Sequence, residues 1–380
     1  MSIADSPKIL FVANVAKEHI VKFHIPTIKM LKEHGWRVDV ACKADADISY
    51  CDDVFDIPTE RSPFHLKTIS AIRKLRKLIR KGQYDIIYCH TVTGGLVARI
   101  AARPFRKSGI KVVYLSHGFY FYRGAPVKKW LMGYPMEWLL SKYTDEIITI
   151  NHEDYEFAKK RLNTPIVKMI DGIGVNLDKF SVDFPPDQKT SYRKSLGFRD
   201  KDYIAIYVAE LTKLKNQTSL IDAAEILAKK IPDFKLLLVG PDHMNGELQR
   251  KAKKLPDKCV VFTGWRNDVC QLLHISDIAL ASSSSEGLGL NIVEAMACGL
   301  PVVAYDNRGH REIISDRING RLIPFNDVNK LADAVVEIHD NRNSADKWKE
   351  NAMESTKRFG NSNVLAEIYE ILGQILDSKS

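Results

Sequence analysis

Two carboxylates and two glycines share a short segment, SSSSEGLGLNIVEAMACG, in the second half of the chain. Glu286 is followed directly by Gly287, Leu288 and Gly289, and seven residues separate it from Glu294. The pattern predicts a loop that opens a helix between two buried strands. Free N–H groups and the positive dipole end suit such a position to a diphosphate, and glycines let its backbone come close. Glu286 could then accept hydrogen bonds from sugar hydroxyls and Glu294 from a ribose diol; a capping glutamate and a solvated glutamate are the alternative.

These residues need a sheet to position them, and short β-branched runs alternate with amphipathic segments of helix length. Helices are expected near residues 20–34, 66–81, 94–106, 127–142 and 152–162. Ten strands are expected: KILFVAN, VDVAC, DIIYCH, VVYLSH, EIITI, YIAIYVA, KLLLVG, CVVFTG, DIALASS and PVVAY. The pattern indicates an α/β protein with two Rossmann-like, doubly wound parallel-sheet domains.

A polar stretch with paired prolines, FSVDFPPDQKTSYRKS, interrupts the alternation and marks the interdomain connection. We expect an N-terminal domain over 1–178, a C-terminal domain over 179–360, and a final helix in 361–380 that packs back on the first domain. A length of 380 residues agrees with two hydrophobic cores.

The composition, 45% apolar and 27% charged, is that of a folded globular protein. Neither a signal peptide nor a run of about 18 apolar residues is recognised. Six cysteines occur without a CxxC pair, which argues against zinc and against a disulfide framework and favours a cytoplasmic location. They are Cys42, Cys51, Cys89, Cys259, Cys270 and Cys298.

The excess of positive over negative charge lies in the first half of the chain. Residues 1–180 hold 29 Lys and Arg against 19 Asp and Glu, and the remainder holds 27 against 28. LKTISAIRKLRKLIRK, residues 66–81, is a basic amphipathic helix: either an ordinary crossover helix or a surface for anionic lipid. KKWLMGYPMEWLL, residues 128–140, either packs as a buried helix or exposes Trp130, Met132 and Trp138 to a membrane. No nucleic-acid recognition module accompanies the charge.

The segment with the paired glutamates resembles the donor-binding signature of the family-four retaining glycosyltransferases, where the second Glu holds the ribose and the first contacts the sugar. The resemblance covers nearly the whole chain. The matching segments together resemble the branch of this family that builds bacterial exopolysaccharide, capsule and O-antigen. It implies the GT-B fold, with two Rossmann-like domains facing a cleft. Further matching segments are KFHIPTIKMLKEHGWRVDVAC, SHGFYFYRGAP, GIGVNLDKF, VGPDHMNGELQ and FTGWRNDV.

The resemblance also implies roles for residues that follow predicted strands. His117 would lie near the donor sugar, Lys215 would neutralise the leaving diphosphate, and Arg266 lies in a segment similar to the base-contacting loop. A satisfied strand-end histidine and a surface lysine are the alternatives, and the role of His90 stays open. The chain departs from the family at Glu210, where an arginine is usual; Lys213 and Arg266 are candidate replacements.

The implied reaction is retaining, metal-independent hexosyl transfer from a nucleotide sugar, with a UDP-sugar expected, and no cofactor. The implied acceptor is a polyprenyl-diphosphate-linked glycan or another oligosaccharide. The DxD sequence Asp45–Ala46–Asp47 is expected to be a solvated loop rather than a metal site. An epimerase of the same fold and a non-catalytic nucleotide-sugar-binding subunit remain alternatives. A nicotinamide-dependent dehydrogenase is disfavoured, because the third glycine of its fingerprint is missing.

Overall fold

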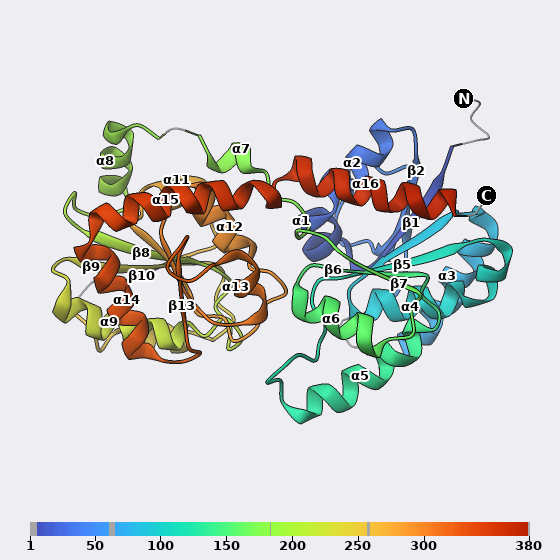
Figure 1. The fold of residues 1–380 in the computed structure, drawn as a ribbon, viewed down its shortest axis with the longest axis horizontal. Helices are drawn as coiled ribbons and strands as arrows, with labels where there is room; N and C mark the ends of the chain where they lie inside the picture. Colours follow the sequence, from blue (N-terminus) through green and yellow to red (C-terminus); the bar gives the residue numbers. More distant parts are fainter. Residues whose placement is uncertain (1–5, 61–64, 183, 257–258, 379–380) are drawn as a thin grey trace. The chain divides into compact units, whose positions relative to one another are not determined.

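The computed structural model describes residues 6–60, 65–182, 184–256 and 259–378 (Figure 1). The chain forms two compact units. Unit 1 contains Met1–Gly174 and Asn361–Ser380, and unit 2 contains Val175–Gly360. Helix α16 (Asn361–Asp377) therefore belongs to unit 1, where it packs on α2 (Ile25–Glu33).

Unit 1 is built on a seven-stranded parallel sheet in the order β3-β2-β1-β4-β5-β6-β7. Its inner strands are buried on both faces, as their unbroken apolar runs predict. The expected strands are confirmed, but β3 and β7, which are short and lie at the two edges, were not predicted. The strands are β1 (Lys8–Val15), β2 (Arg37–Lys43), β3 (Asp53–Asp56), β4 (Ile86–His90), β5 (Lys111–Ser116), β6 (Glu146–Thr149) and β7 (Ile166–Met169).

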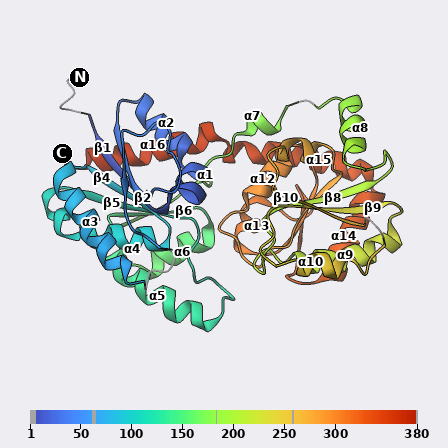
Figure 2. The same ribbon diagram turned by 180° about the vertical axis from the view of Figure 1, so that it is seen from behind.

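Helices cover both faces of this sheet. Figures 1 and 2 show α2 and α16 along one face and α3, α4 and α5 toward the other. The helices that complete the unit are α1 (Val21–Phe23), α3 (Lys67–Gly82), α4 (Val92–Ala102), α5 (Val127–Ser141) and α6 (His152–Arg161), with a 3₁₀ turn over Arg103–Ser108.

The segment expected as one helix over 20–34 is divided: a π-helical turn, η2 (Ala16–Ile20), precedes it, and His24 separates the short helix α1 from α2. One carboxylate oxygen anchors the turn: Asp45 Oδ1 accepts hydrogen bonds from the backbone N–H groups of Ala16 and Lys17 at 3.0 and 2.8 Å. Asp45 is exposed, as expected, but it fixes the segment that leaves β1.

Unit 2 repeats the architecture with a six-stranded parallel sheet, β10-β9-β8-β11-β12-β13. The sequence analysis missed only the edge strand β13 (Arg321–Ile323), which has three residues. The other strands are β8 (Tyr203–Val208), β9 (Phe234–Val239), β10 (Val260–Gly264), β11 (Ile278–Ala281) and β12 (Val302–Tyr305). The helices are α7 (Leu177–Phe180), α8 (Pro186–Ser195), α9 (Gln217–Lys230), α10 (Glu247–Ala252), α11 (Val269–His274), α12 (Leu290–Ala297), α13 (Arg308–Ile313), α14 (Val328–Asp340) and α15 (Arg342–Thr356), with a 3₁₀ turn over Lys357–Phe359.

The strand order reverses once in each sheet, between β1 and β4 in unit 1 and between β8 and β11 in unit 2. Such a switch point leaves a crevice at the carboxyl ends of the two strands, where doubly wound folds bind ligands. The prediction of two Rossmann-like domains is confirmed, and each unit has one such position for a site.

A buried carboxyl on β6 predicts how stability depends on pH. Burial raises the pKa of Glu146 from 4.5 to about 7, although Lys168 opposes the shift. The folded chain therefore holds a proton between these values that the unfolded chain has lost, so stability falls as pH rises through this window. We expect Glu146→Gln to remove up to about 3 kcal/mol of that dependence, measured as urea unfolding from about pH 4.5 to pH 8.

The exposed Glu156, which pairs with Lys160 on α6, offers a matched control. Glu156→Gln should leave the pH profile nearly unchanged, since exposed pairs contribute little. Identical profiles for the wild-type chain and Glu146→Gln would contradict the assignment.

Candidate functional site

Two loops meet at the switch point of unit 2, one after β8 and one after β11. The Ser282 hydroxyl donates to the Lys215 carbonyl at 2.7 Å, and the Ser284 N–H donates to the Leu214 carbonyl at 2.9 Å. These bonds hold the Lys215 loop against the segment that leads into Glu286.

The side chains of Lys215 and Glu286 form an ion pair, with 2.5 Å between Nζ and Oε1. The Ser283 hydroxyl donates to the same carboxylate oxygen at 2.6 Å, and lies 2.7 Å from the buried Tyr207 hydroxyl. Burial tends to raise the pKa of Glu286, but Lys215 and Ser283 outweigh it, so the pKa is lowered. The sequence analysis singled out both residues of the pair for separate roles, and the structure places them in contact.

The backbone between Glu286 and α12 is shaped by glycines. Gly289 is the N-cap residue of α12 and has a φ of 108°, in the region that favours glycine. A Cβ added to Gly309 would lie 2.7 Å from the Leu288 carbonyl oxygen and 2.8 Å from Glu286 Cβ. Gly287 and Leu288 therefore lie on a loop that packs directly against the start of α13.

Arg308, which the sequence analysis did not single out, lies beside this loop. Its side chain is nearly buried, and Nε donates to the Glu286 carbonyl at 3.2 Å. Glu210, at the position where the family usually has arginine, points a largely exposed carboxylate toward His243, 3.9 Å away. Lys213 is exposed. Arg308 is thus a cation that packs against the Glu286 backbone without being near it in sequence.

Glu294 lies in α12 and is partly buried. Burial is the main cause of the raised pKa values of the Cys270 and Cys298 thiols, and the charge of Glu294 adds to both shifts. The sulfurs of these cysteines and a ring nitrogen of His274 lie within 4.8 Å of one another. The sequence gives no spacing signal for this group, because folding brings together residues of two helices, α11 and α12.

Arg266 is held by a neighbour: its Nε donates to Asp268 Oδ1 at 2.7 Å, and a second guanidinium nitrogen contacts Oδ2. The same guanidinium lies 3.3 Å from the Tyr192 hydroxyl. A ligand at this loop would meet a guanidinium that already has a carboxylate partner.

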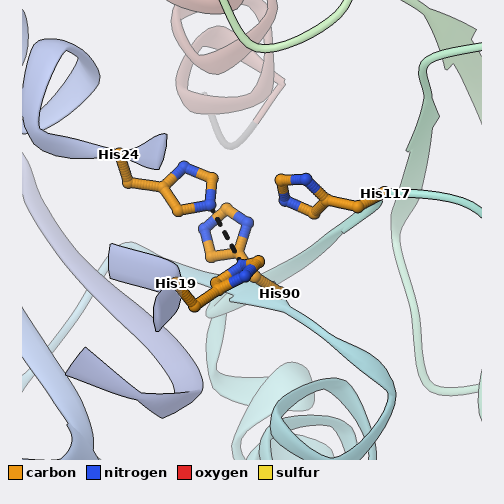
Figure 3. Close-up of side chains that lie close together, drawn as sticks. All are labelled: His19, His24, His90 and His117. Carbon is orange, nitrogen blue, oxygen red and sulfur yellow. Dashed lines mark hydrogen bonds between the residues drawn. The ribbon is translucent and has the colours of Figure 1, made fainter. Parts of the chain in front are cut away.

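The switch point of unit 1 gathers four histidines (Figure 3). His117 follows β5, His90 ends β4, and His19 and His24 follow β1. Burial lowers the pKa of His19 to about 2 and that of His117 to about 4, so these rings are neutral. The sequence analysis named His117 and left His90 open; it missed the other two, whose only signal is their position after the first strand.

Two doubly wound parallel-sheet units, each with a switch point, are the architecture of the GT-B fold. Residues 8–151 match the family described as "Glycosyl transferase 4-like", and residues 188–355 match "Glycosyl transferases group 1". The chain belongs to this glycosyltransferase family, as the resemblance predicted.

Among similar proteins is EpsD of Bacillus subtilis, named as a glycosyltransferase, which is 42% identical over 97% of both chains. An Escherichia coli enzyme, "UDP-Gal:alpha-D-GlcNAc-diphosphoundecaprenol alpha-1,3-galactosyltransferase", is 28% identical over 85% of each chain. The crystal structure of Anabaena Alr3699/HepE with UDP and glucose has the same fold, with a TM-score of 0.81 and 23% identity, over 97% of this chain and 100% of the other.

Close packing at Gly309 predicts that this residue maintains the loop before α12. Gly309→Ala should destabilise unit 2 by about 1–3 kcal/mol, because its methyl group would overlap backbone atoms of Leu288. Hydrogen exchange of residues 286–290 should accelerate more than exchange elsewhere.

Gly373 in α16 has open space around its Cβ position, so Gly373→Ala is the matched control. It should be neutral or slightly stabilising, by up to about 1 kcal/mol, since alanine favours helix. Equal stability of Gly309→Ala and the wild-type chain would contradict the packing argument.

Proposed function

We propose that the chain is a retaining, metal-independent hexosyltransferase that moves a sugar from a UDP-sugar to a polyprenyl-diphosphate-linked or oligosaccharide acceptor, in the synthesis of a surface polysaccharide. The observation that carries the proposal is the Lys215–Glu286 pair beside the glycine loop before α12. UDP and glucose in the Anabaena structure support the choice of donor. The name of the E. coli relative supports the choice of acceptor.

In this proposal the donor diphosphate lies against the N-terminus of α12, where Lys215 and the backbone N–H groups stabilise its charge. Glu294 binds the ribose hydroxyls and Glu286 the donor sugar, and His117 keeps its expected role as a sugar contact. Arg308 supplies the second positive charge in place of the arginine that Glu210 replaces, because it already contacts the Glu286 backbone.

The C1–O bond to the diphosphate breaks, and the acceptor oxygen attacks the anomeric carbon from the same face. Because attack comes from the face that the diphosphate leaves, the configuration at the anomeric carbon is retained. The acceptor proton passes to an oxygen of the leaving phosphate. Glu286 is a poor nucleophile for the alternative covalent route, since one of its oxygens accepts from both Lys215 and Ser283.

Cationic side chains take the place of magnesium in this scheme. The DxD sequence gives no better metal site, because Asp45 Oδ1 already accepts two backbone hydrogen bonds. An epimerase or a binding subunit would use the same nucleotide contacts, so activity has to separate the three functions.

We expect release of nucleoside diphosphate from one donor in a panel of nucleotide sugars, measured in EDTA. Lys215→Ala should lower kcat about 10²- to 10³-fold, because the charge on the leaving group loses its ammonium. Glu294→Ala should lower kcat/KM about ten- to hundredfold through lost charged hydrogen bonds. Glu286→Gln and Arg308→Gln complete the series, and both should lower turnover.

Lys213→Ala, on the same loop and exposed, is the matched control and should retain activity. Donor binding without turnover would make the chain a binding subunit, and epimerised donor would make it an epimerase. Activity that disappears in EDTA and returns with magnesium would refute metal independence.

The acceptor side of the proposal rests on unit 1. A cavity of about 330 Å³ has an apolar wall of Phe121, Trp130 and Phe157, and its other lining residues include three basic and three acidic ones: Arg123, Lys160, Arg161, Glu153, Asp154 and Glu156. The apolar wall suits the hydrocarbon chain of a polyprenyl-linked acceptor, whereas the charges of the lining balance one another. Trp130 itself is packed in this wall rather than exposed, with its indole N–H donating to the Tyr122 carbonyl.

Helix α5 presents a second apolar surface next to this cavity. Glu137 faces inward, where Arg99 binds it through two hydrogen bonds of 2.7 and 3.0 Å. The exposed fractions of Leu131 and Trp138 are 71% and 40%, and Val127, Met132 and Leu139 are also exposed. No helix in the described part of the chain is long and apolar enough to cross a bilayer. We infer that α5, with the exposed lysines of α3, docks on anionic lipid at the inner face of the membrane.

Lys74→Glu with Lys77→Glu should weaken binding to phosphatidylserine vesicles at least about tenfold, since each basic residue near such a surface contributes about 1 kcal/mol. Leu131→Ser should weaken it as well. Arg76 is left unchanged because it donates to the Ile100 carbonyl. Co-sedimentation with vesicles measures the effect.

The exposed pair Lys253 and Lys254 in unit 2 gives a control with the same change of charge. Lys253→Glu with Lys254→Glu should bind vesicles as the wild-type chain does. Equal loss in both double variants would mean that net charge, rather than this surface, drives binding.

A further inference from the structure

We propose that His19, His24, His90 and His117 form a binding site for a divalent transition-metal ion, with Zn²⁺ as its probe. One ring nitrogen from each histidine lies within 4.8 Å of the others. These four residues are four of the eleven histidines in the chain. The proposal concerns unit 1 alone and does not rest on the proposed function.

The spacing of three rings fits tetrahedral coordination. Zn–N bonds of about 2.0–2.1 Å at tetrahedral angles place neighbouring nitrogens about 3.3 Å apart and ring centroids about 5 Å apart. His19 Nε2 and His24 Nε2 are 3.2 Å apart. The centroids of His19, His24 and His117 are separated by 4.7, 5.0 and 5.2 Å.

His90 lies behind this triangle, with its ring 3.9 Å from that of His24 and 5.8 and 5.9 Å from those of His19 and His117. Figure 3 shows its ring between the labelled neighbours, and the dashed line joins His19 and His24. One ring nitrogen of His90 lies within 4.8 Å of a nitrogen of each other ring, and coordination by His90 requires its side chain to move away from His24.

The cluster also contains nitrogens that lack a partner. Among the described residues, neither ring nitrogen of the fully buried His90 has a hydrogen-bond partner, nor does Nε2 of His117. A buried polar atom without a partner costs about 1–3 kcal/mol. A metal ion that accepts the lone pairs of these nitrogens would remove part of that cost.

The chemistry of the ligands selects the metal. Imidazole suits zinc, copper and nickel, whereas magnesium and calcium prefer oxygen ligands. A nitrogen-only site therefore discriminates against the magnesium that commonly accompanies nucleotides.

The fold places these histidines together for one reason. They leave the carboxyl ends of β1, β4 and β5, which are adjacent in the sheet around its switch point. His19 lies in the π-helical turn η2, a rare conformation that is frequent at functional sites. Asp45 anchors that turn through two backbone hydrogen bonds and so limits the movement of His19.

The test is a Zn²⁺ titration of the full-length chain after EDTA treatment and removal of the chelator, read with a competing chromophoric chelator. The background carries Cys270→Ser and Cys298→Ser, which removes the second cluster of possible ligands. We expect one Zn²⁺ per chain, and His24→Gln should weaken binding at least about 100-fold, more than loss of an outer-shell partner would. Magnesium should not compete.

His243→Gln, at an exposed position, is the matched control and should bind Zn²⁺ normally. His24 is buried, so its replacement by Gln also changes the packing of the core. His117→Gln, at the edge of the cluster, is therefore a second variant. Circular dichroism checks that each variant is folded. Zn²⁺ should raise the thermal midpoint of the background chain and of His243→Gln, but not of the ligand variants.

Cobalt provides an independent readout in the chain with its cysteines intact. Four-coordinate Co²⁺ with nitrogen ligands gives intense visible bands without the thiolate charge-transfer band that Cys270 and Cys298 would add. No binding in the serine background, or unchanged affinity in folded His24→Gln and His117→Gln, would overturn the proposal. Inhibition of turnover by Zn²⁺ would depend on the proposed role of His117, whereas the binding result would not.

Discussion

A parallel sheet brings the carboxyl ends of all its strands to one edge, and the reversal of strand order opens a crevice there. The four histidines lie at this point in unit 1, and the pair of Lys215 and Glu286 lies at it in unit 2. The surrounding layers of helices exist to bury the two sheets. The chemistry of the chain therefore depends on a constraint of topology before it depends on any single residue.

The two switch points differ in the charge of the residues that they hold. In unit 2 Lys215 and the Ser283 hydrogen bond lower the pKa of Glu286, so this carboxylate stays ionised while mostly buried. In unit 1 no carboxylate contributes to the shifted pKa values of the histidines, whose causes are burial and the neighbouring rings. Unit 2 thus offers the Lys215 side chain to an anionic ligand, and unit 1 offers the lone pairs of neutral imidazole nitrogens.

Helix α5 shows how one element serves both core and surface. The buried pair of Arg99 and Glu137 ties its inner side to α4, with the Arg99 guanidinium 4.1 Å from the centre of the Tyr114 ring. Rotation of α5 about its axis would break this pair and leave an uncompensated buried charge. The cost of that charge fixes the rotation of the helix. Leu131 and Trp138 are consequently held on the outer side.

The sequence by itself determined the inner strands, because continuous β-branched runs bury on both faces, and it determined the glutamate and glycine motif, whose members are neighbours in the chain. The edge strands β3, β7 and β13 are too short to leave such a pattern, and β3 is also mostly exposed. Only the tertiary structure decided that Lys215 contacts Glu286, that Arg308 packs on its backbone, and that four histidines converge. These are contacts between segments far apart in the sequence, which the order of strands in a sheet creates and no local spacing encodes.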